Sequence, residues 1–440
     1  MQPLADILTN ALARGDAEPT GLCVAFSGGR DSSVLLHALH GLALPVPLRA
    51  IHIDHGLLAE SAGWAAHCET VCRQWQIPMQ VTRVDVSSAA ADGGLEAAAR
   101  DARYAVFRAE LRPGEFLLTA HHSDDQLETV LLRLMRGSGP AGVAGIRPFA
   151  PFGPGYLVRP LLQAGRAQLV DYARQHALKW VEDPSNRDEG RDRNFLRHRV
   201  LPLLRERWPA APDTVTRTAR LADEAVHLLD ELAELDAGAV VDGDTLHLGL
   251  LRELSARRQR NLLRWFLHRH EVPPPSAAAL HDGLRQLCEA RADSAPRLSW
   301  SAGELRRYRD RLYLLKCHPD SEPVPESRRW DGQAPLELGS LAGQLALRQG
   351  IGGTPDVGGQ ALTVRFRRGG ERLLQHGQHV SLKSLYQSGG IVPWMRPHVP
   401  LVFHGDELLT VGGLWYAENP PGSGVATGLE VAWTPRERLR

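Results

Sequence analysis

Residues 21–135 alternate between two hydrophobic periods, and this alternation constrains the fold more than any other feature of the chain. Short apolar runs rich in β-forming residues are bounded by turn residues, at 21–26, 48–53, 80–86 and 116–120. Longer stretches of helical pattern follow them, at roughly 32–40, 63–76, 95–111 and 123–135. Strands that alternate with helices predict a parallel sheet with helices on both faces, and ligands bind such sheets at the carboxyl ends of the strands.

The pattern changes after the turn-rich stretch 137–145. Residues 214–291 are helical in pattern, residues 318–327 resemble a linker, and short strands such as 362–366 and 408–412 lie between Gly-rich turns near the end. We therefore expect an α/β protein with several domains. The predicted parts are a Rossmann-like parallel-sheet domain at 1–212, a helical domain at 213–320, a linker and irregular segment at 321–355, and a small mixed α/β domain at 356–440.

Composition is that of a soluble globular protein, with 43% hydrophobic and 23% charged residues. The 51 basic and 51 acidic residues cancel, so a site for a polyanion must come from local clustering. Five scattered cysteines argue against a disulfide framework and for a reducing compartment. We recognise neither a signal peptide nor an apolar run of about 20 residues, and expect a cytoplasmic protein without a membrane span. Nothing in the sequence indicates an oligomeric state.

The first predicted strand ends directly in Ser27-Gly28-Gly29-Arg30-Asp31-Ser32, which runs into a helix. Glycines let the backbone approach a phosphate, and the N–H groups at a helix N-terminus favour an anion. Asp31 would repel a bare phosphate, so the loop implies a bridging Mg²⁺ or another cation. The alternative interpretation is a Gly-rich turn in which Asp31 caps the helix.

Acidic residues open the helix after the fourth predicted strand, in the segment 119–129. Asp125 and Glu128 are three residues apart and share a helix face, as do Asp124 and Glu128. Two carboxylates on one face suit a primary ammonium group or Mg²⁺, whereas the alternative is a capped, solvated helix start. We disfavour zinc, both at His121 and His122 with these aspartates and at the Cys68–Cys72 pair, because each set lacks partners.

Other polar groups outside the loop and the acidic helix are also candidate sites. For His52, Asp54 and His55 at the second strand end, we favour polar packing over a metal site, because His55 points to the opposite face. Residues 193–207 hold five arginines, one histidine and a single acid, which is a basic patch suited to RNA phosphates. The Arg-rich stretches 257–269 and 365–383 are further candidates, the first being equally consistent with a solvated helix face.

The loop SGGRDS, on a strand-to-helix turn without a Walker lysine, resembles the signature of the PP-loop ATP pyrophosphatases. A larger set resembles the bacterial tRNA(Ile)-lysidine synthases in content and order: SGGRDS, 94-GLEAAARDARY-104, AHHSDDQLET, 133-RLMRGSG-139, 183-DPSN-186 and 193-RNFLRHRVLP-202. These motifs cover the first half of the chain, and a looser match extends through the middle to 365-RFRRGGERL-373 and 382-LKSLY-386.

The resemblance implies an ATP- and Mg²⁺-dependent ligation of free L-lysine to C2 of the wobble cytidine of tRNA(Ile) with a CAU anticodon. An adenylated cytidine would be the intermediate, pyrophosphate and AMP the products, and decoding would change from AUG to AUA. By the same resemblance, Ser27 to Ser32 and the backbone near Ile53 would bind ATP, with Asp31 toward Mg²⁺. Asp125 and Glu128 would position the lysine ammonium, and Arg103, or else Arg100, would steady a phosphate or the reacting base. Arg193, Arg197 and Arg199 are the predicted tRNA-binding residues, with the two later domains as further tRNA-binding parts.

Two alternatives belong to other classes. One is a different PP-loop enzyme, such as a tRNA thiolase or an amide-forming synthetase, although the cysteines lie outside the site motifs and no glutaminase segment is visible. The other is a tRNA-binding protein with a vestigial ATP site, against which the intact loop and acidic helix argue.

Overall fold

The computed structural model describes most of the 440 residues, namely 3–13, 17–54, 61–84, 95–184, 188–291, 294–316, 326–339, 341–355, 362–418 and 426–435. The chain divides into two compact units, Met1–Leu229 and Asp230–Arg440. Each unit is considered by itself below. Among the described helices, none has the length and apolar character needed to cross a bilayer.

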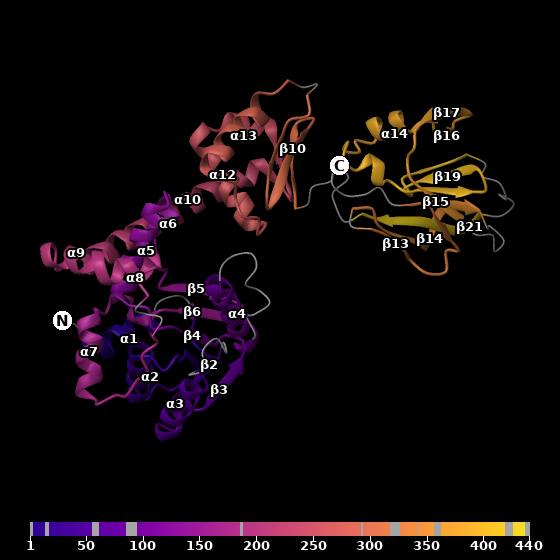
Figure 1. Ribbon diagram of the computed structural model, residues 1–440. Helices are drawn as coiled ribbons and strands as arrows, with labels where there is room; N and C mark the ends of the chain where they lie inside the picture. Colours follow the sequence, from indigo (N-terminus) through magenta and orange to yellow (C-terminus); the bar gives the residue numbers. More distant parts are fainter. Residues whose placement is uncertain are drawn as a thin grey trace. The chain divides into compact units, whose positions relative to one another are not determined.

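The first unit is built on a six-stranded sheet with the order β3-β2-β1-β4-β6-β5 (Figure 1). The strands are β1 (Leu22–Ala25), β2 (Leu48–Asp54), β3 (Met79–Arg83), β4 (Phe116–Leu118), β5 (Phe149–Phe152) and β6 (Gly155–Val158). All neighbouring pairs are parallel except β5 and β6, which form an antiparallel hairpin. The predicted parallel α/β sheet is therefore confirmed, and the hairpin extends it by two strands.

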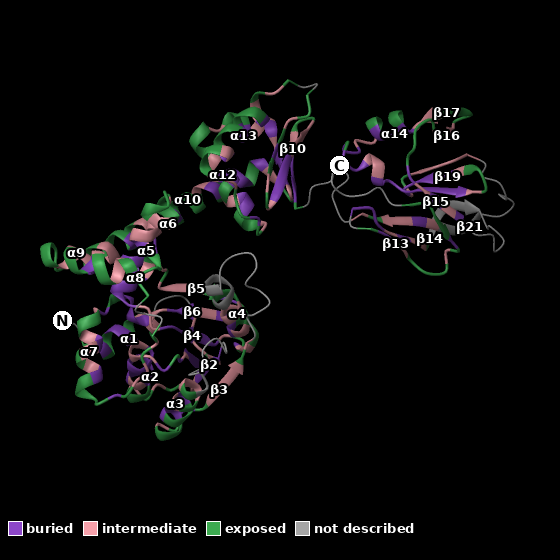
Figure 2. Ribbon diagram, viewed as in Figure 1, coloured by how far each residue is buried: buried purple, intermediate pink, exposed green. Residues whose placement is uncertain are grey.

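Helices cover both faces of this sheet. Helices α1 (Leu4–Leu12), α2 (Arg30–Gly41), α3 (Ser61–Gln74) and α7 (Arg166–Gln175) pack on one face, and α4 (Leu95–Glu110) packs on the other. Because side chains alternate along a strand, Val24 contributes to the first of these cores and Cys23 to the second. Figure 2 shows the central strand β4 fully buried and the edge strand β3 only partly covered.

The strand order reverses between β1 and β4, so the connections from these two neighbours leave in opposite directions. Such a switch point opens a crevice at the carboxyl ends of the strands, which is where ligands bind in this class of sheet. Helix α2 begins there after β1, and helix α5 (Ser123–Met135) begins there after β4. The two polar motifs that the sequence singled out thus lie side by side.

Shorter elements complete the first unit around α5. They are α6 (Pro140–Val143), η2 (Pro160–Gln163), α8 (Asp192–Phe195), the π-helical turn η4 (Leu196–Val200), α9 (Leu201–Arg207) and the start of the long helix α10 (Ala211–Val240).

The middle of the chain combines the predicted helices with a sheet that we did not predict. Helices α11 (Leu248–Glu253), α12 (Ala256–Arg269) and α13 (Ala277–Glu289) share a core with an antiparallel sheet ordered β7-β8-β11-β10-β9. Its strands are β7 (Val241–Asp242), β8 (Thr245–His247), β9 (Arg297–Trp300), β10 (Gly303–Tyr308) and β11 (Arg311–Leu315). Phe266 and Leu305 are fully buried where helix and sheet meet.

The C-terminal part is mainly antiparallel β structure with one short helix, α14 (Leu382–Ser388). Its larger sheet has the order β12-β15-β18-β19-β20, with strands Arg328–Trp330, Leu362–Arg365, Leu401–His404, Glu407–Val411 and Trp415–Tyr416. The others are β13-β14-β21 (Leu336–Gly339, Gly343–Pro355, Ala426–Thr434) and β16-β17 (Arg372–Gln375, Gln378–Ser381). Residues 321–355, expected to be a linker and irregular segment, therefore carry three strands, because Leu338 and Leu345 supply buried apolar side chains to a core.

Candidate functional site

The loop after β1 is held in a conformation that only glycine adopts without strain. Gly28 has φ +78°, and a Cβ there would stand 2.8 Å from Cys68 Sγ and 3.2 Å from Val181 Cγ2. Its carbonyl accepts a hydrogen bond from the Val181 N–H at 3.0 Å. A side chain at Gly28 would therefore disturb both the backbone conformation and the packing beneath the loop.

Hydroxyl groups brace the loop from within. Ser27 Oγ and Ser32 Oγ lie 3.0 Å apart, and the Ser32 and Ser33 hydroxyls both donate to the Gly29 carbonyl. Gly29 occupies the N-cap of α2 and supplies no side chain there. No side chain therefore caps the first N–H groups of α2, and a ligand can accept hydrogen bonds from them. A glycine turn that leads into a helix N-terminus favours phosphate binding.

Asp31 lies in the first turn of α2 and faces the start of α5. Its carboxylate contacts the Arg30 guanidinium at 2.8 Å, and its Oδ2 lies 3.6 Å from His122 Nε2. Burial raises the pKa of Asp31, but hydrogen bonding and charge from His122 and Arg30 outweigh it and lower this pKa. The side chain is a charged, 31% exposed oxygen ligand, so its chemistry fits a hard cation such as Mg²⁺.

His122 joins the two halves of the site. It is the N-cap of α5, where its Nδ1 accepts from the Asp124 N–H while Asp125 Oδ2 accepts from the His122 N–H at 3.0 Å. The other ring nitrogen, Nε2, lies 3.5 Å from Asp125 Oδ2 and 3.6 Å from Asp31 Oδ2. This capping box satisfies backbone donors that the helix start would otherwise leave unpaired, and it also fixes Asp125.

Asp125 and Glu128 form the acidic pair that the sequence predicted, and the structure brings two arginines onto it. Arg193 reaches Asp125 Oδ1 at 3.0 Å and Glu128 Oε2 at 2.8 Å. Arg197 reaches Asp125 Oδ1 at 3.2 Å and both Glu128 oxygens at 2.7 and 2.9 Å. The two guanidiniums come from successive turns, α8 and η4, so one short segment closes over the acidic pair.

Burial and charge set the ionisation of Asp125. Burial raises the pKa of Asp125, but the charges of His122, His121 and Arg193 and the backbone hydrogen bond lower it to about 2. The pKa of the neighbouring His121 falls to about 3, first because of burial and then because of Arg159, Arg193 and Arg100, although Asp125 opposes this. At neutral pH Asp125 is therefore held as an anion beside an uncharged His121 imidazole.

Asp124 is turned away from the pair and acts as a structural anchor. Its carboxylate forms an ion pair with Arg205 and accepts a hydrogen bond from the Arg166 N–H at 3.0 Å. These contacts tie α5 to α9 and to the start of α7. Sequence reasoning placed Asp124 on the face of Glu128, but it did not identify either partner.

The other predicted site residues lie on α4, near the end of β2 and in η4. Arg103 lies half-buried on α4, and the Arg100 guanidinium stacks over the Tyr104 ring at 4.8 Å. Of these two arginines, it is Arg100 that contributes to the electrostatics of His121. Ile53 is half-buried near the end of β2, and Arg199 pairs with Glu189 at 2.9 Å on the surface rather than with the acidic pair.

The side chains at the end of β2 that were considered as metal ligands make ordinary polar contacts. His52 Nδ1 lies 2.8 Å from the Phe26 carbonyl and 3.6 Å from Cys68 Sγ, and Asp54 pairs with Arg83. Across the described ranges, no group of three or more His, Cys, Asp or Glu side chains is arranged to hold a metal ion. His55, Gly94, Ser185 and Asn186 lie outside the described residues.

His122 and the two closing arginines are the functional candidates whose role the sequence did not reveal. The histidine was considered only as an unsuitable zinc ligand, and Arg193 and Arg197 only as contacts for RNA phosphates. A helix N-cap three residues before Asp125 is a local signal for the role of His122. The arginine contacts span more than 60 residues of chain, so only the fold reveals them.

The assembled site has two compartments with different chemistry. A loop whose geometry suits a phosphate, with a carboxylate at its edge, lies after β1, and a pair of carboxylates whose chemistry suits an ammonium group lies after β4. His122 contacts the carboxylates of both. The arrangement suits a reaction in which a nucleotide activates one substrate and a cationic amine attacks it.

Models of three protein domains match the chain in order. A PP-loop domain matches residues 3–204, a TilS substrate binding domain matches 246–313, and a TilS substrate C-terminal domain matches 362–433. The first covers the unit that contains both compartments, and the other two fall within Asp230–Arg440.

Several relatives are similar along nearly their whole length. A tRNA(Ile)-lysidine synthase of Alkalilimnicola ehrlichii is 44% identical over 428 residues, which is 95% of this chain and 96% of the relative. Enzymes of the same name from Methylococcus capsulatus and Escherichia coli O157:H7 are 41% and 40% identical, each over 94% of this chain and 96% of the relative.

Proposed function

Because the chain belongs to the tRNA(Ile)-lysidine synthase family, whose members are ligases with a PP-loop ATPase domain, we propose that it joins free L-lysine to tRNA(Ile). The proposed bond forms at C2 of the wobble cytidine in a CAU anticodon. ATP first adenylates the C2 oxygen and pyrophosphate leaves. The ε-amine of lysine then displaces AMP, and its nitrogen loses a proton.

The observation that carries this proposal is the pairing of two compartments at one switch point of the sheet. The phosphate loop and the acidic pair lie on neighbouring strands, and His122 contacts Asp31 and Asp125 at 3.6 and 3.5 Å. A vestigial ATP site would not need this connection. A thiolase would need a reactive sulfur, whereas burial raises the pKa of Cys68 to about 12, despite its position beneath the loop.

In the first step, the loop Ser27–Ser32 holds the ATP phosphates, with adenine beside the backbone near Ile53. Asp31 is the proposed Mg²⁺ ligand, because it is a charged oxygen donor at the edge of the loop. When bound, Mg²⁺ neutralises charge that develops on the departing pyrophosphate. Arg103, or alternatively Arg100, steadies a phosphate or the reacting base.

In the second step, Asp125 and Glu128 hold the lysine ammonium. The lowered pKa of Asp125 makes this carboxylate a strong ion-pair partner but a weak proton acceptor, so we assign it to orientation rather than to deprotonation. Arg193 and Arg197 both bind carboxylate oxygens of this pair, so each must give up hydrogen bonds when the lysine amine binds. Released from the pair, these arginines are free to meet RNA phosphates, together with Arg199.

The test is the incorporation of radiolabelled lysine into an isoleucine tRNA transcript with a CAU anticodon. We expect labelling that requires ATP and Mg²⁺ and that is lost in Asp31→Ala. Labelling of the RNA without ATP, or full activity of the folded Asp31→Ala variant, would contradict the proposal. Sulfur incorporation instead of lysine would favour the thiolase alternative.

A further inference from the structure

A cavity of about 330 Å³ lies behind the acidic helix, within the first unit. Gln126 of α5 contributes to its wall, and since consecutive helix residues are about 100° apart, this side faces away from Glu128. The remaining walls come from residues 144–148, from η2 and from the first turns of α10. We propose that this cavity holds one unstacked nucleobase of the RNA substrate, near the base that is modified; the inference rests on the proposed function.

Two residues of the cavity wall have buried oxygen atoms that make no hydrogen bond in the described chain. Thr216 Oγ1 and Asp223 Oδ1 are buried without a hydrogen bond in the described chain, although Arg147 Nε lies 3.2 Å from the latter oxygen. The Gln126 amide, by contrast, is satisfied by the backbone of Ile146 at 2.6 and 3.2 Å. A buried polar atom without a partner is costly, so Thr216 Oγ1 favours a ligand that presents an N–H group, whereas Asp223 Oδ1 already has Arg147 as its ion-pair partner.

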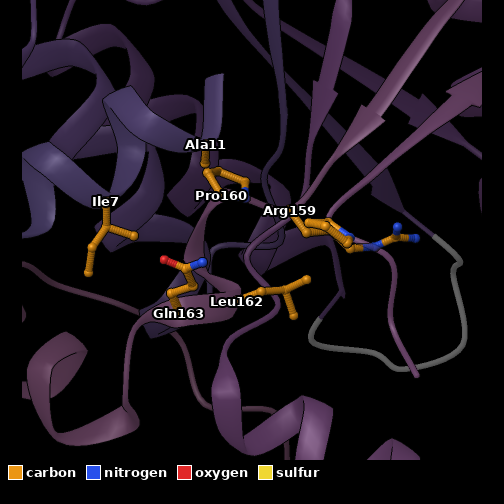
Figure 3. A pocket seen from close by; sticks show the side chains of 7 residues that line it. Ile7, Ala11, Arg159, Pro160, Leu162 and Gln163 are labelled. Atoms are coloured by element: carbon orange, nitrogen blue, oxygen red, sulfur yellow. The ribbon is translucent and has the colours of Figure 1, made fainter. Parts of the chain in front are cut away.

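The remaining lining fits a flat, partly apolar ring. Leu162 and Ile146 supply apolar surface, and Gln163 presents an amide. Figure 3 shows Leu162 and Gln163 of η2 next to Arg159 and Pro160, seen from a small neighbouring hollow that these residues also line. Base edges offer exocyclic amino groups to acceptors, and glutamine pairs well with adenine. The chemistry favours a base with an exocyclic amino group.

Positively charged side chains at the rim of the cavity suit the phosphate groups of such a nucleotide. Arg217 and Arg220 line the cavity from one face of α10, and neither has an ion-pair partner among the residues described. Behind the rim, Arg133 donates to the Gly145 carbonyl at 2.7 Å. Burial and the charges of Arg100 and Arg147 lower the pKa of Arg133, while Asp213 and Asp223 of α10 place two carboxylates in the cavity wall.

A nucleobase explains these features together better than an amino acid does. The cavity lies within the range of about 300–1,000 Å³ that small-molecule sites occupy. It is separated from the acidic pair by the thickness of α5, about 10–12 Å with side chains. A loop of single-stranded RNA, whose bases unstack readily, spans such a distance and places phosphates on guanidiniums at the rim.

Substitutions on α10 test the proposal, with Thr218 as the matched control. Thr216→Val removes only the hydroxyl, and Thr216→Trp fills the cavity, whereas Thr218 is exposed on the same helix and bonds only to the Thr214 carbonyl. The dissociation constant of the isoleucine tRNA transcript should rise about threefold to tenfold in Thr216→Val and more in Thr216→Trp. Thr218→Val and Thr218→Trp should change it by less than about twofold.

The binding measurement requires no catalysis, so its failure is distinguishable from that of the proposed function. Equal binding by the Thr216 and Thr218 variants would overturn the inference, and Thr216→Val decides the matter if the tryptophan variant does not fold. A rise in the KM for lysine with unchanged RNA binding would also overturn it and assign the cavity to an amino acid.

Transcripts that carry an abasic site at each anticodon-loop position in turn identify the base. We expect one position, other than the modified cytidine, at which the abasic site weakens binding to the wild-type protein. At that position the abasic site should not weaken binding to Thr216→Trp any further. Additive losses at every position would contradict a base in the cavity.

Discussion

At the residue scale, each carboxylate on α5 is matched by cations from other parts of the first unit. Asp125 and Glu128 share Arg193 and Arg197, and Asp124 takes Arg205. The sequence could identify the acidic pair because spacing along a helix determines which side chains share a face. It could not identify their partners, because these contacts depend on tertiary structure.

Asp125→Asn should lower stability in a pH-dependent manner. The pKa of Asp125 falls from 3.8 to about 2, so its charged form stabilises the fold above pH 4, and the effect is lost as pH falls toward 2. The difference corresponds to about 2 kcal/mol near neutral pH and to about half of that at pH 3. Urea unfolding of both proteins across this range provides the measurement. A difference independent of pH would contradict the assignment.

Gly28→Ala should impair both folding and ATP binding. The alanine would adopt an unfavourable positive φ and meet Cys68 and Val181, at a cost of about 2 kcal/mol or more. Gly41→Ala is the matched control, because a Cβ there meets nothing within 4 Å. Thermal unfolding and ATP titration should separate the two variants, and equal behaviour would refute the argument from loop geometry.

At the element scale, the segment of α8 and η4 closes over the acidic pair by presenting arginines from successive turns. Arg197→Gln should destabilise the protein by about 1–3 kcal/mol, because Glu128 is only 1% exposed and loses charged hydrogen bonds. Arg199→Gln removes an exposed pair and should cost less than about 0.5 kcal/mol. Chemical denaturation measures both, and similar losses would show that the closing contacts are not specific to Arg197.

Elements with long, regular patterns were predictable, and short ones were not. Strands β1 to β4 and helices α2 to α5 lie within a few residues of their predicted positions, as do β15 and β19. The hairpin β5–β6 was missed because its sequence, FAPFGPGYLV, carries proline and glycine that usually indicate loops. Strands β7 to β11 were missed because they are short and flank helices, so their pairing depends on contacts distant in sequence.

At the scale of the whole molecule, charge is balanced overall but locally separated. The chain has 51 basic and 51 acidic residues, yet basic clusters occur in both units. Exposed Arg368 in the C-terminal part should contact RNA phosphate, so Arg368→Gln should weaken tRNA binding and reduce the slope of log K against log salt by about one. Exposed Arg174 on α7 is the control, and an equal effect of Arg174→Gln would indicate nonspecific attraction.

The division of labour between the two compartments is tested most directly by trapping the intermediate. ATP radiolabelled in its α-phosphate is mixed with the folded enzyme and the CAU transcript without lysine, and lysine is added afterwards. We predict that label appears on the RNA and then leaves as AMP when lysine is added, and that Asp125→Asn retains label on the RNA. Lysine incorporation without any labelled RNA intermediate, or release of AMP by Asp125→Asn at the wild-type rate, would contradict the account.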